Sequence, residues 1–242
     1  MNNLYPILIT SIAGFSTILG NVLLFFSLKH KDKLISFSLG LSFIIMFLIS
    51  IIELIPEGLK LVRGEINSFS LFVISLSLLF VGYFIVKLID KNIECNDSLY
   101  KVGILSMISL LIHNIPEGMI CAITSSTNVD LGLKMSFIIL IHNIPEGICI
   151  SLPIYYATKS KIKAIIYTAI SGMGEVVGAI FTVLFLKDII NIYTLFFILI
   201  ITAGIMITLS LRKILKEGLS FKKYNWFFAG VIVGILILII TL

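Results

Sequence analysis

Long apolar stretches that recur along the whole chain are the feature that most restricts its fold. A transmembrane helix needs about 20 mostly apolar residues. A soluble domain could not bury so much apolar surface, because 59% of the 242 residues are hydrophobic and only 13% are charged. The sequence therefore predicts an all-α polytopic membrane protein that forms a single domain over residues 1–242. Its eight transmembrane helices are expected at residues 4–28, 34–58, 69–88, 101–124, 131–157, 162–186, 190–211 and 224–242.

Lysine and arginine are distributed unevenly between the two ends of these helices. The first, third, fifth and seventh connections, with their flanks, hold 14 of the 18 basic residues. The alternate connections hold only Lys60, Arg63, Lys134 and Lys187. Cytoplasmic loops of membrane proteins carry the excess of basic residues, so both termini are predicted to be extracytoplasmic. The net charge of +5 then reflects orientation in a lipid bilayer, and we expect no nucleic-acid partner.

A seven-residue block occurs twice inside the apolar sequence. Residues 112–118 read IHNIPEG, and residues 141–147 repeat them without a change. Within each block the histidine and the glutamate are four positions apart and share a helix face, with the asparagine as a neighbour. The polar side chains of the two blocks are His113, Asn114, Glu117, His142, Asn143 and Glu146.

The depth of these side chains indicates what neutralises them. At about 1.5 Å per residue, both blocks and Glu175 lie near the middle of a bilayer core about 30 Å thick. Three unpaired carboxylates there would cost on the order of 8–10 kcal/mol, and no lysine or arginine lies at that depth. Protonation or a bound cation must compensate. Imidazole beside carboxylate suits zinc and other borderline divalent ions, so we predict a site for one or two divalent ions.

The backbone of each block has its own constraint. Pro116 and Pro145 lack an N–H and clash with the carbonyl four residues before them, so each helix is expected to kink. Gly118 and Gly147 permit close approach of a neighbouring helix or local unwinding. Consecutive helices run antiparallel, so the two blocks are predicted to face each other about an approximate two-fold axis, as at the substrate sites of transporters.

Two further glutamates, Glu53 and Glu57, lie late in the second predicted helix. They are therefore expected closer to the extracytoplasmic face than the two blocks are. Such residues either line an entrance for ions or are ordinary interfacial residues. The segment Pro56-Glu57-Gly58 repeats the end of the block without its histidine and asparagine. Both interpretations stay open at this point.

The last helix contains a pair of small residues, Gly230 and Gly234, separated by three positions. Such pairs let two helices approach closely in a membrane. The pair is compatible with packing inside the chain or with a homodimer, and the pattern alone does not decide between them.

The motifs resemble those of the ZIP (Zrt-/Irt-like) family of divalent-metal transporters. His113-Asn114-x-Pro116-Glu117-Gly118 is similar to the motif of the family's fourth helix, and the second block to that of the fifth. Ser171-Gly172-x-x-Glu175 resembles the sixth helix, residues 13–20 the first, and Glu53-x-x-Pro56-Glu57 the second. The resemblance covers nearly the whole chain.

The resemblance implies an eight-helix zinc importer of the cytoplasmic membrane of a bacterium, with a two-metal site between helices four and five. Glu117, His142 and Glu146 would bind zinc, with His113 beside them. A neighbouring site for iron or another divalent cation would use Asn114, Asn143 and Glu175 with the two bridging glutamates, Glu117 and Glu146. Many relatives have a further histidine and acidic residue in the fifth helix, where this chain has Asn143.

Three alternatives to a transporter remain. The histidines and glutamates could hydrogen-bond only to one another and so rigidify the bundle. An intramembrane metalloenzyme is disfavoured, because the sequence has no HExxH pair and no separate general base beside an open metal position. A metal sensor without transport would bind ions and move none, so metal-dependent flux separates it from a transporter.

Overall fold

The helices predicted from the apolar stretches are present in a computed structural model of the chain, which describes residues 4–25, 31–93, 96–189 and 191–241. The elements in these ranges are all helical, apart from one isolated bridge pair between Arg63 and Ile66. They are α1 (Leu4–Phe15), η1 (Ser16–Phe25), α2 (Lys31–Ile49), η2 (Ser50–Leu54), α3 (Ile55–Leu61), α4 (Ser68–Asn92), α5 (Ser98–Thr127), α6 (Val129–Thr158), α7 (Lys161–Ile189), α8 (Ile192–Leu209), η3 (Ser210–Ile214), α9 (Leu215–Ser220) and α10 (Tyr224–Thr241).

Seven of the helical segments in the described ranges are long and apolar enough to cross a membrane. Some of them consist of several consecutive elements, such as α2, η2 and α3, which together span Lys31–Leu61. An eighth, shorter apolar helix covers Tyr224–Ile240. Each lies on one of the predicted stretches, so the expected polytopic membrane protein is confirmed at this level.

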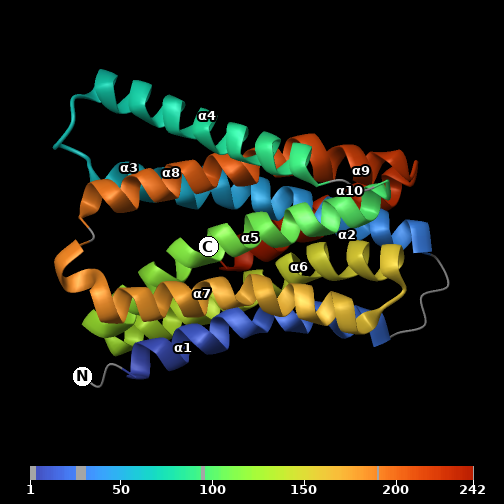
Figure 1. The fold of residues 1–242 in the computed structure, drawn as a ribbon, viewed down its shortest axis with the longest axis horizontal. Coiled ribbons are helices and arrows are strands. Elements are labelled where there is room, and N and C mark those ends of the chain that lie inside the picture. The colour runs from blue at the N-terminus through green and yellow to red at the C-terminus, as the bar shows by residue number, and fades with distance from the viewer. Residues whose placement is uncertain (1–3, 26–30, 94–95, 190, 242) are drawn as a thin grey trace.

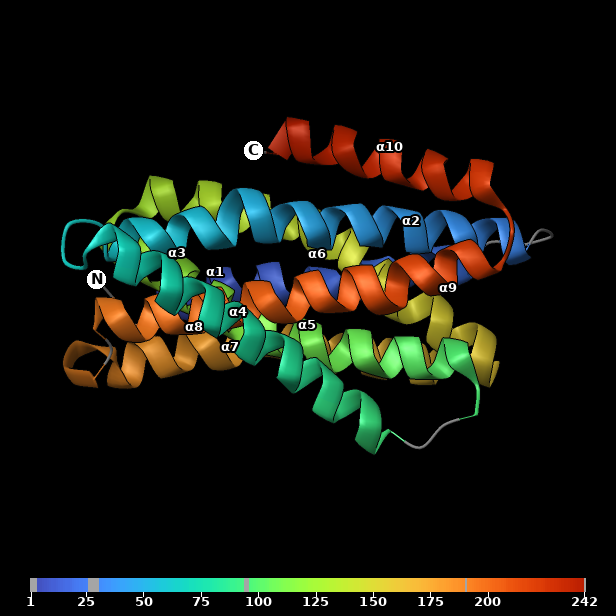
Figure 2. The same cartoon turned by 90° about the horizontal axis from the view of Figure 1, so that it is seen from above.

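Successive long segments run in opposite directions (Figures 1 and 2). The chain begins at one end of the bundle, and α10 runs back toward that same end. The odd-numbered connections therefore gather at the opposite end, which we call the basic end because it carries the excess of lysine and arginine. Lys29 of this set lies outside the described residues, as does the side chain of Lys187. The assignment of the basic end to the cytoplasm stays a prediction.

Two predicted connections are wrong. The stretch from Ser125 to Asp130 was expected to be a loop, but α5 continues to Thr127 and only Asn128 separates it from α6. The Ser126 hydroxyl donates to the Ala122 carbonyl four residues back, which is compatible with a continuing helix. The side chain of Asn128 then caps α6 by accepting from the Leu131 N–H.

The predicted connection from Arg212 to Lys223 is also mostly helical, because η3 and α9 extend α8 to Ser220. Lysine, arginine and glutamate are good helix formers. Charge in this sequence therefore indicates where the apolar span ends, whereas the helix itself continues by about two turns.

Two segments depart from α-helical geometry beside the repeated blocks. The first is η1, a ten-residue 3₁₀ helix, in which the Thr17 hydroxyl donates to the carbonyl of Gly14, three residues back. The second is η2, a π-helical turn that ends before Pro56. Such π turns are rare and often occur at functional sites.

Glycine sets the close helix crossings around the blocks. A Cβ atom on Gly118 would collide with the backbone of Glu175 in α7, and one on Gly147 would collide with the Thr17 carbonyl in η1. Both glycines remain within helices, which confirms close approach rather than local unwinding. α5 and α6 are continuous through Pro116 and Pro145, and the kinks stay a prediction.

The Gly230 and Gly234 pair packs inside the chain. A Cβ atom on Gly230 would meet the Phe37 carbonyl of α2, and one on Gly234 would meet the Ile44 side chain. The surface around this pair is therefore covered by α2, and a homodimer would need another surface.

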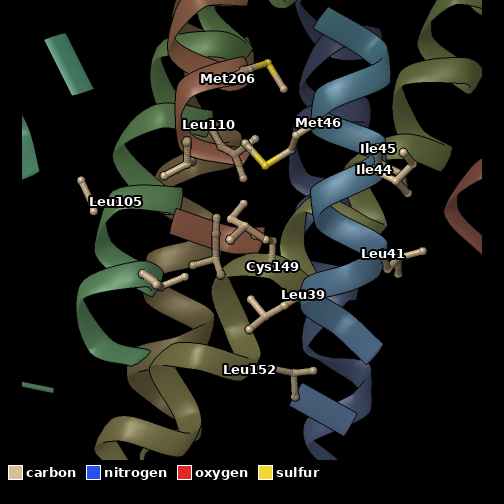
Figure 3. Close-up of a cluster of buried hydrophobic side chains, with 14 of the residues drawn as sticks. Leu39, Leu41, Ile44, Ile45, Met46, Leu105, Leu110, Cys149, Leu152 and Met206 are labelled. Carbon is tan, nitrogen blue, oxygen red and sulfur yellow. The ribbon is translucent and has the colours of Figure 1, made fainter. Parts of the chain in front are cut away.

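A large part of the main apolar core lies between the blocks and the basic end. Figure 3 shows Met46 of α2, Leu110 of α5 and Met206 of α8 pointing into one space, close to Cys149 of α6. These side chains are fully or almost fully buried. Leu110 precedes the block on α5, whereas Cys149 follows the block on the antiparallel α6, so both lie on the basic-end side of it. The core closes that half of the bundle.

Candidate metal centre

The structure brings the polar side chains of both blocks together in the interior. They lie on α5 and α6, with Glu175 on α7 beside them. None of the seven side chains is more than 9% exposed, although all are polar or ionisable. These are His113, Asn114, Glu117, His142, Asn143, Glu146 and Glu175.

The histidines and glutamates contact one another across the two helices. His142 Nε2 lies 2.6 Å from Glu117 Oε1, which is a hydrogen bond between α6 and α5. His113 Nε2 lies 3.8 Å from Glu117 Oε2 in its own block and 3.8 Å from Glu146 Oε1 in the other. The expected sharing of one face within a block is confirmed for His113 and Glu117, and the two blocks do face each other.

The asparagines connect this cluster to α7 and α1. The Asn143 side-chain amide donates to Glu175 Oε1 at 2.5 Å and to the Ala13 carbonyl at 3.0 Å. The Asn114 amide donates to the Ser171 carbonyl at 3.1 Å. The contribution of Ala13 could not be read from the sequence, because any residue type offers the same carbonyl and only the packing of α1 brings it here.

Many polar atoms of the cluster have no hydrogen-bond partner among the described residues. Buried polar atoms normally find one, and leaving them unpaired is costly. If the cluster served packing alone, its polar atoms would be expected to form hydrogen bonds with one another. The unpartnered atoms are both ring nitrogens of His113, Asn114 Oδ1, Glu117 Oε2, Asn143 Oδ1, both carboxylate oxygens of Glu146, and Glu175 Oε2. Oxygen and imidazole nitrogen atoms concentrated in this way are donors that a divalent cation can coordinate.

The side chains that could coordinate a metal ion do not surround a common point. Within the described residues, no three His, Cys, Asp or Glu side chains are placed so that they could hold one metal ion together. The hydrogen bond between His142 and Glu117 accounts for part of this, because it joins two of the donors directly to each other. Coordination of an ion would require this bond to open and the side chains to turn toward a shared centre.

Glu53 and Glu57 lie beside this cluster. Both are partly buried, and Glu53 is in the π turn η2. They line a narrow cavity of about 20 Å³ together with His113 and Glu117, a space of the order of one water molecule. The remainder of its lining is apolar and includes Met135 and Leu199, neither of which the sequence pattern singled out. The cavity therefore lies between η2 and α3 on one side and α5 on the other.

Comparison with known proteins identifies relatives over the whole chain. The family model described as "ZIP Zinc transporter" matches residues 95–241. The protein named zinc transporter ZupT of Campylobacter jejuni is 34% identical, with 97% of this chain and 94% of the relative covered. The proteins of the same name in Escherichia coli O7:K1 and Clostridium perfringens are 33% and 30% identical, covering 95% and 100% of this chain and 92% and 96% of the relatives.

Proposed function

The chain belongs to the ZIP family of zinc transporters, and from this membership we propose that it imports zinc across the cytoplasmic membrane of a bacterium. Members of this family are transporters and not enzymes, so the metalloenzyme hypothesis is set aside. The helices long enough to span a membrane agree with a multi-pass transporter. Zinc is the cargo here and not a resident cofactor.

The observation that carries the proposal for the site is the buried cluster of unpartnered donor atoms on α5, α6 and α7. Glu117, His142 and Glu146 would bind zinc, with His113 alongside. The two glutamates would also bridge to a second site, at which Fe²⁺ or another divalent cation binds. That second site would use Asn114, Asn143 and Glu175, whose side-chain oxygens include three without a hydrogen-bond partner.

The asymmetry of the bundle about this cluster supports the proposed direction of transport. The cavity lined by Glu53 and Glu57 lies on the side of the cluster away from the basic residues, and the part of the apolar core around Met46, Leu110 and Met206 packs on the other side. Zinc would therefore enter from outside past these carboxylates and leave at the basic, cytoplasmic end. A transport cycle would require the core around Met46, Leu110 and Met206 to open.

The experiment that tests the proposal is zinc uptake into proteoliposomes that contain the purified chain. We expect saturable uptake of radioactive zinc, with unlabelled zinc as a strong competitor and Fe²⁺ as a measurable one. Vesicles without protein provide the control. A protein that binds zinc and yet gives no flux would be a sensor, and the proposal would be wrong.

The entrance carboxylates give a separate prediction. The double substitution Glu53→Gln and Glu57→Gln should raise the zinc concentration for half-maximal uptake several-fold and leave the maximal rate nearly unchanged. The reason is that carboxylates at an entrance raise the local cation concentration, an effect that weakens with ionic strength. Uptake kinetics at low and high salt would measure it. If the maximal rate fell and the half-saturating concentration stayed constant, the two residues would not act as an entrance.

A further inference from the structure

A further polar pocket lies at the basic end of the bundle, and its lining includes neither of the entrance glutamates. It has a volume of about 360 Å³ and lies between the first turns of α5 and the η3–α9 extension of α8. Its polar lining is Ser98, Lys101, Arg212, Lys213, Lys216 and Glu217. Neither the proposed metal site nor the entrance uses any of these residues.

The basic side chains of the pocket are only partly neutralised. Asp90 of α4 forms ion pairs with Lys101 at 3.0 Å and with Lys213 at 2.6 Å. The other carboxylate, that of Glu217, accepts a hydrogen bond from the Ser98 hydroxyl at 2.8 Å. Among the described side chains that line the pocket or pair with its lining, four are basic and two are carboxylates, an excess of two positive charges.

The two basic residues that Asp90 does not hold are Arg212 and Lys216. The Arg212 guanidinium donates to the Tyr83 hydroxyl at 2.6 Å and lies 5.2 Å from the centre of that ring. It forms no ion pair with a carboxylate in the part of the chain that the structure describes. Lys216 is exposed, and it forms no ion pair among the described residues. These two side chains are free to bind an anion.

Arg212 and Lys216 lie on one continuous helical extension. The π turn η3 continues into α9, so Arg212 and Lys216, four positions apart, project from nearly the same side of one helical extension. Tyr83 and Asp90 of α4 contact this extension through Arg212 and Lys213. Asp90 also forms an ion pair with Lys101 of α5. The pocket is therefore a junction of three chain segments and not a set of isolated surface lysines.

The pocket is placed where apolar helices end and charged sequence begins, which is the headgroup level of a bilayer. Tyr83 lies beside it, as aromatic residues do at membrane interfaces. Basic pockets between helices on the cytoplasmic side of membranes attract anionic headgroups. From the charge excess, the position and the volume, we propose that this pocket binds the phosphate-bearing headgroup of an anionic phospholipid.

The test measures phospholipid binding to the purified chain in an uncharged detergent, by native mass spectrometry with added phosphatidylglycerol or phosphatidylcholine. The unchanged chain should bind phosphatidylglycerol more tightly. Each basic residue near an anionic surface contributes about fivefold in affinity, so the double substitution Arg212→Gln and Lys216→Gln should weaken phosphatidylglycerol binding about 30-fold. Lys216→Gln alone, which keeps the contact of Arg212 with Tyr83, should weaken it about fivefold.

The matched control is the double substitution Lys222→Gln and Lys223→Gln, which removes two positive charges from the same end outside the pocket. It should change the affinity by less than about threefold. An equal loss in both double variants would mean diffuse attraction and would overturn the proposal. Inorganic phosphate that displaced phosphatidylglycerol at similar concentrations would instead make this a site for a soluble anion, and equal binding of phosphatidylcholine would also reject it.

Discussion

Replacing Glu146 with glutamine is expected to lower zinc uptake by at least about 100-fold and to leave the protein folded in the membrane. Changes to residues that merely orient metal ligands typically cost about 10–100-fold in affinity, and Glu146 is proposed to be a ligand itself. Both of its carboxylate oxygens are buried without a hydrogen-bond partner. Removing the charge therefore breaks no hydrogen bond among the described residues, whereas it removes a metal-coordinating group from the proposed zinc site. Uptake in transport-deficient cells, normalised to the amount of protein in the membrane, would measure the effect.

The matched control is Glu65→Gln, which removes an exposed carboxylate from the connection between α3 and α4. This variant should transport zinc at the rate of the unchanged chain. Glu146→Ala should be as inactive as Glu146→Gln, because the proposed loss arises from the missing charge and not from side-chain size. Near-normal uptake by Glu146→Gln would exclude this residue from the zinc site.

The number and order of the helices followed from the sequence because the thickness of a bilayer fixes the length of an apolar span. The ends of the helices did not follow in the same way. The segment from Arg212 to Ser220 was predicted as a connection from its charge, yet it is helical. Charge reports the edge of the apolar layer, and helix ends depend on capping groups such as the Asn128 side chain.

The site was predictable in part. Helical periodicity is sufficient to place His113 beside Glu117, because both positions belong to one helix. The pairing of His142 with Glu117 depends on the distance and rotation between α5 and α6, which periodicity within one helix does not determine. Backbone partners such as the Ala13 carbonyl and the π turn that carries Glu53 have no signature in side-chain type. The small residues of the blocks pointed to close packing and did not specify the partner.

Adding one methyl group at Gly118 is expected to disturb both stability and transport. The new Cβ would overlap the backbone of Glu175, which cannot move aside as a side chain could. α5 and α7 would have to separate, and such overpacking costs about 1–3 kcal/mol, although alanine is intrinsically a better helix former than glycine by about 1 kcal/mol. The shift would draw Glu175 away from Asn143, to which it is hydrogen-bonded at 2.5 Å. We therefore expect Gly118→Ala to lower the melting temperature and to reduce zinc uptake at least tenfold.

The control for this substitution is Gly58→Ala, which makes the same chemical change in α3. There the nearest atom to the new Cβ would be Cδ1 of Ile200 at 3.0 Å, so a side-chain end would need to shift slightly and no backbone atom would be in the way. Because the helix propensity of alanine then acts without a backbone collision, this variant should be at least as stable as the unchanged chain and should transport zinc normally. Thermal unfolding in detergent and uptake in vesicles would compare the two variants. If Gly118→Ala matched Gly58→Ala in both measurements, the backbone contact between α5 and α7 would not be what positions Glu175 at the proposed site.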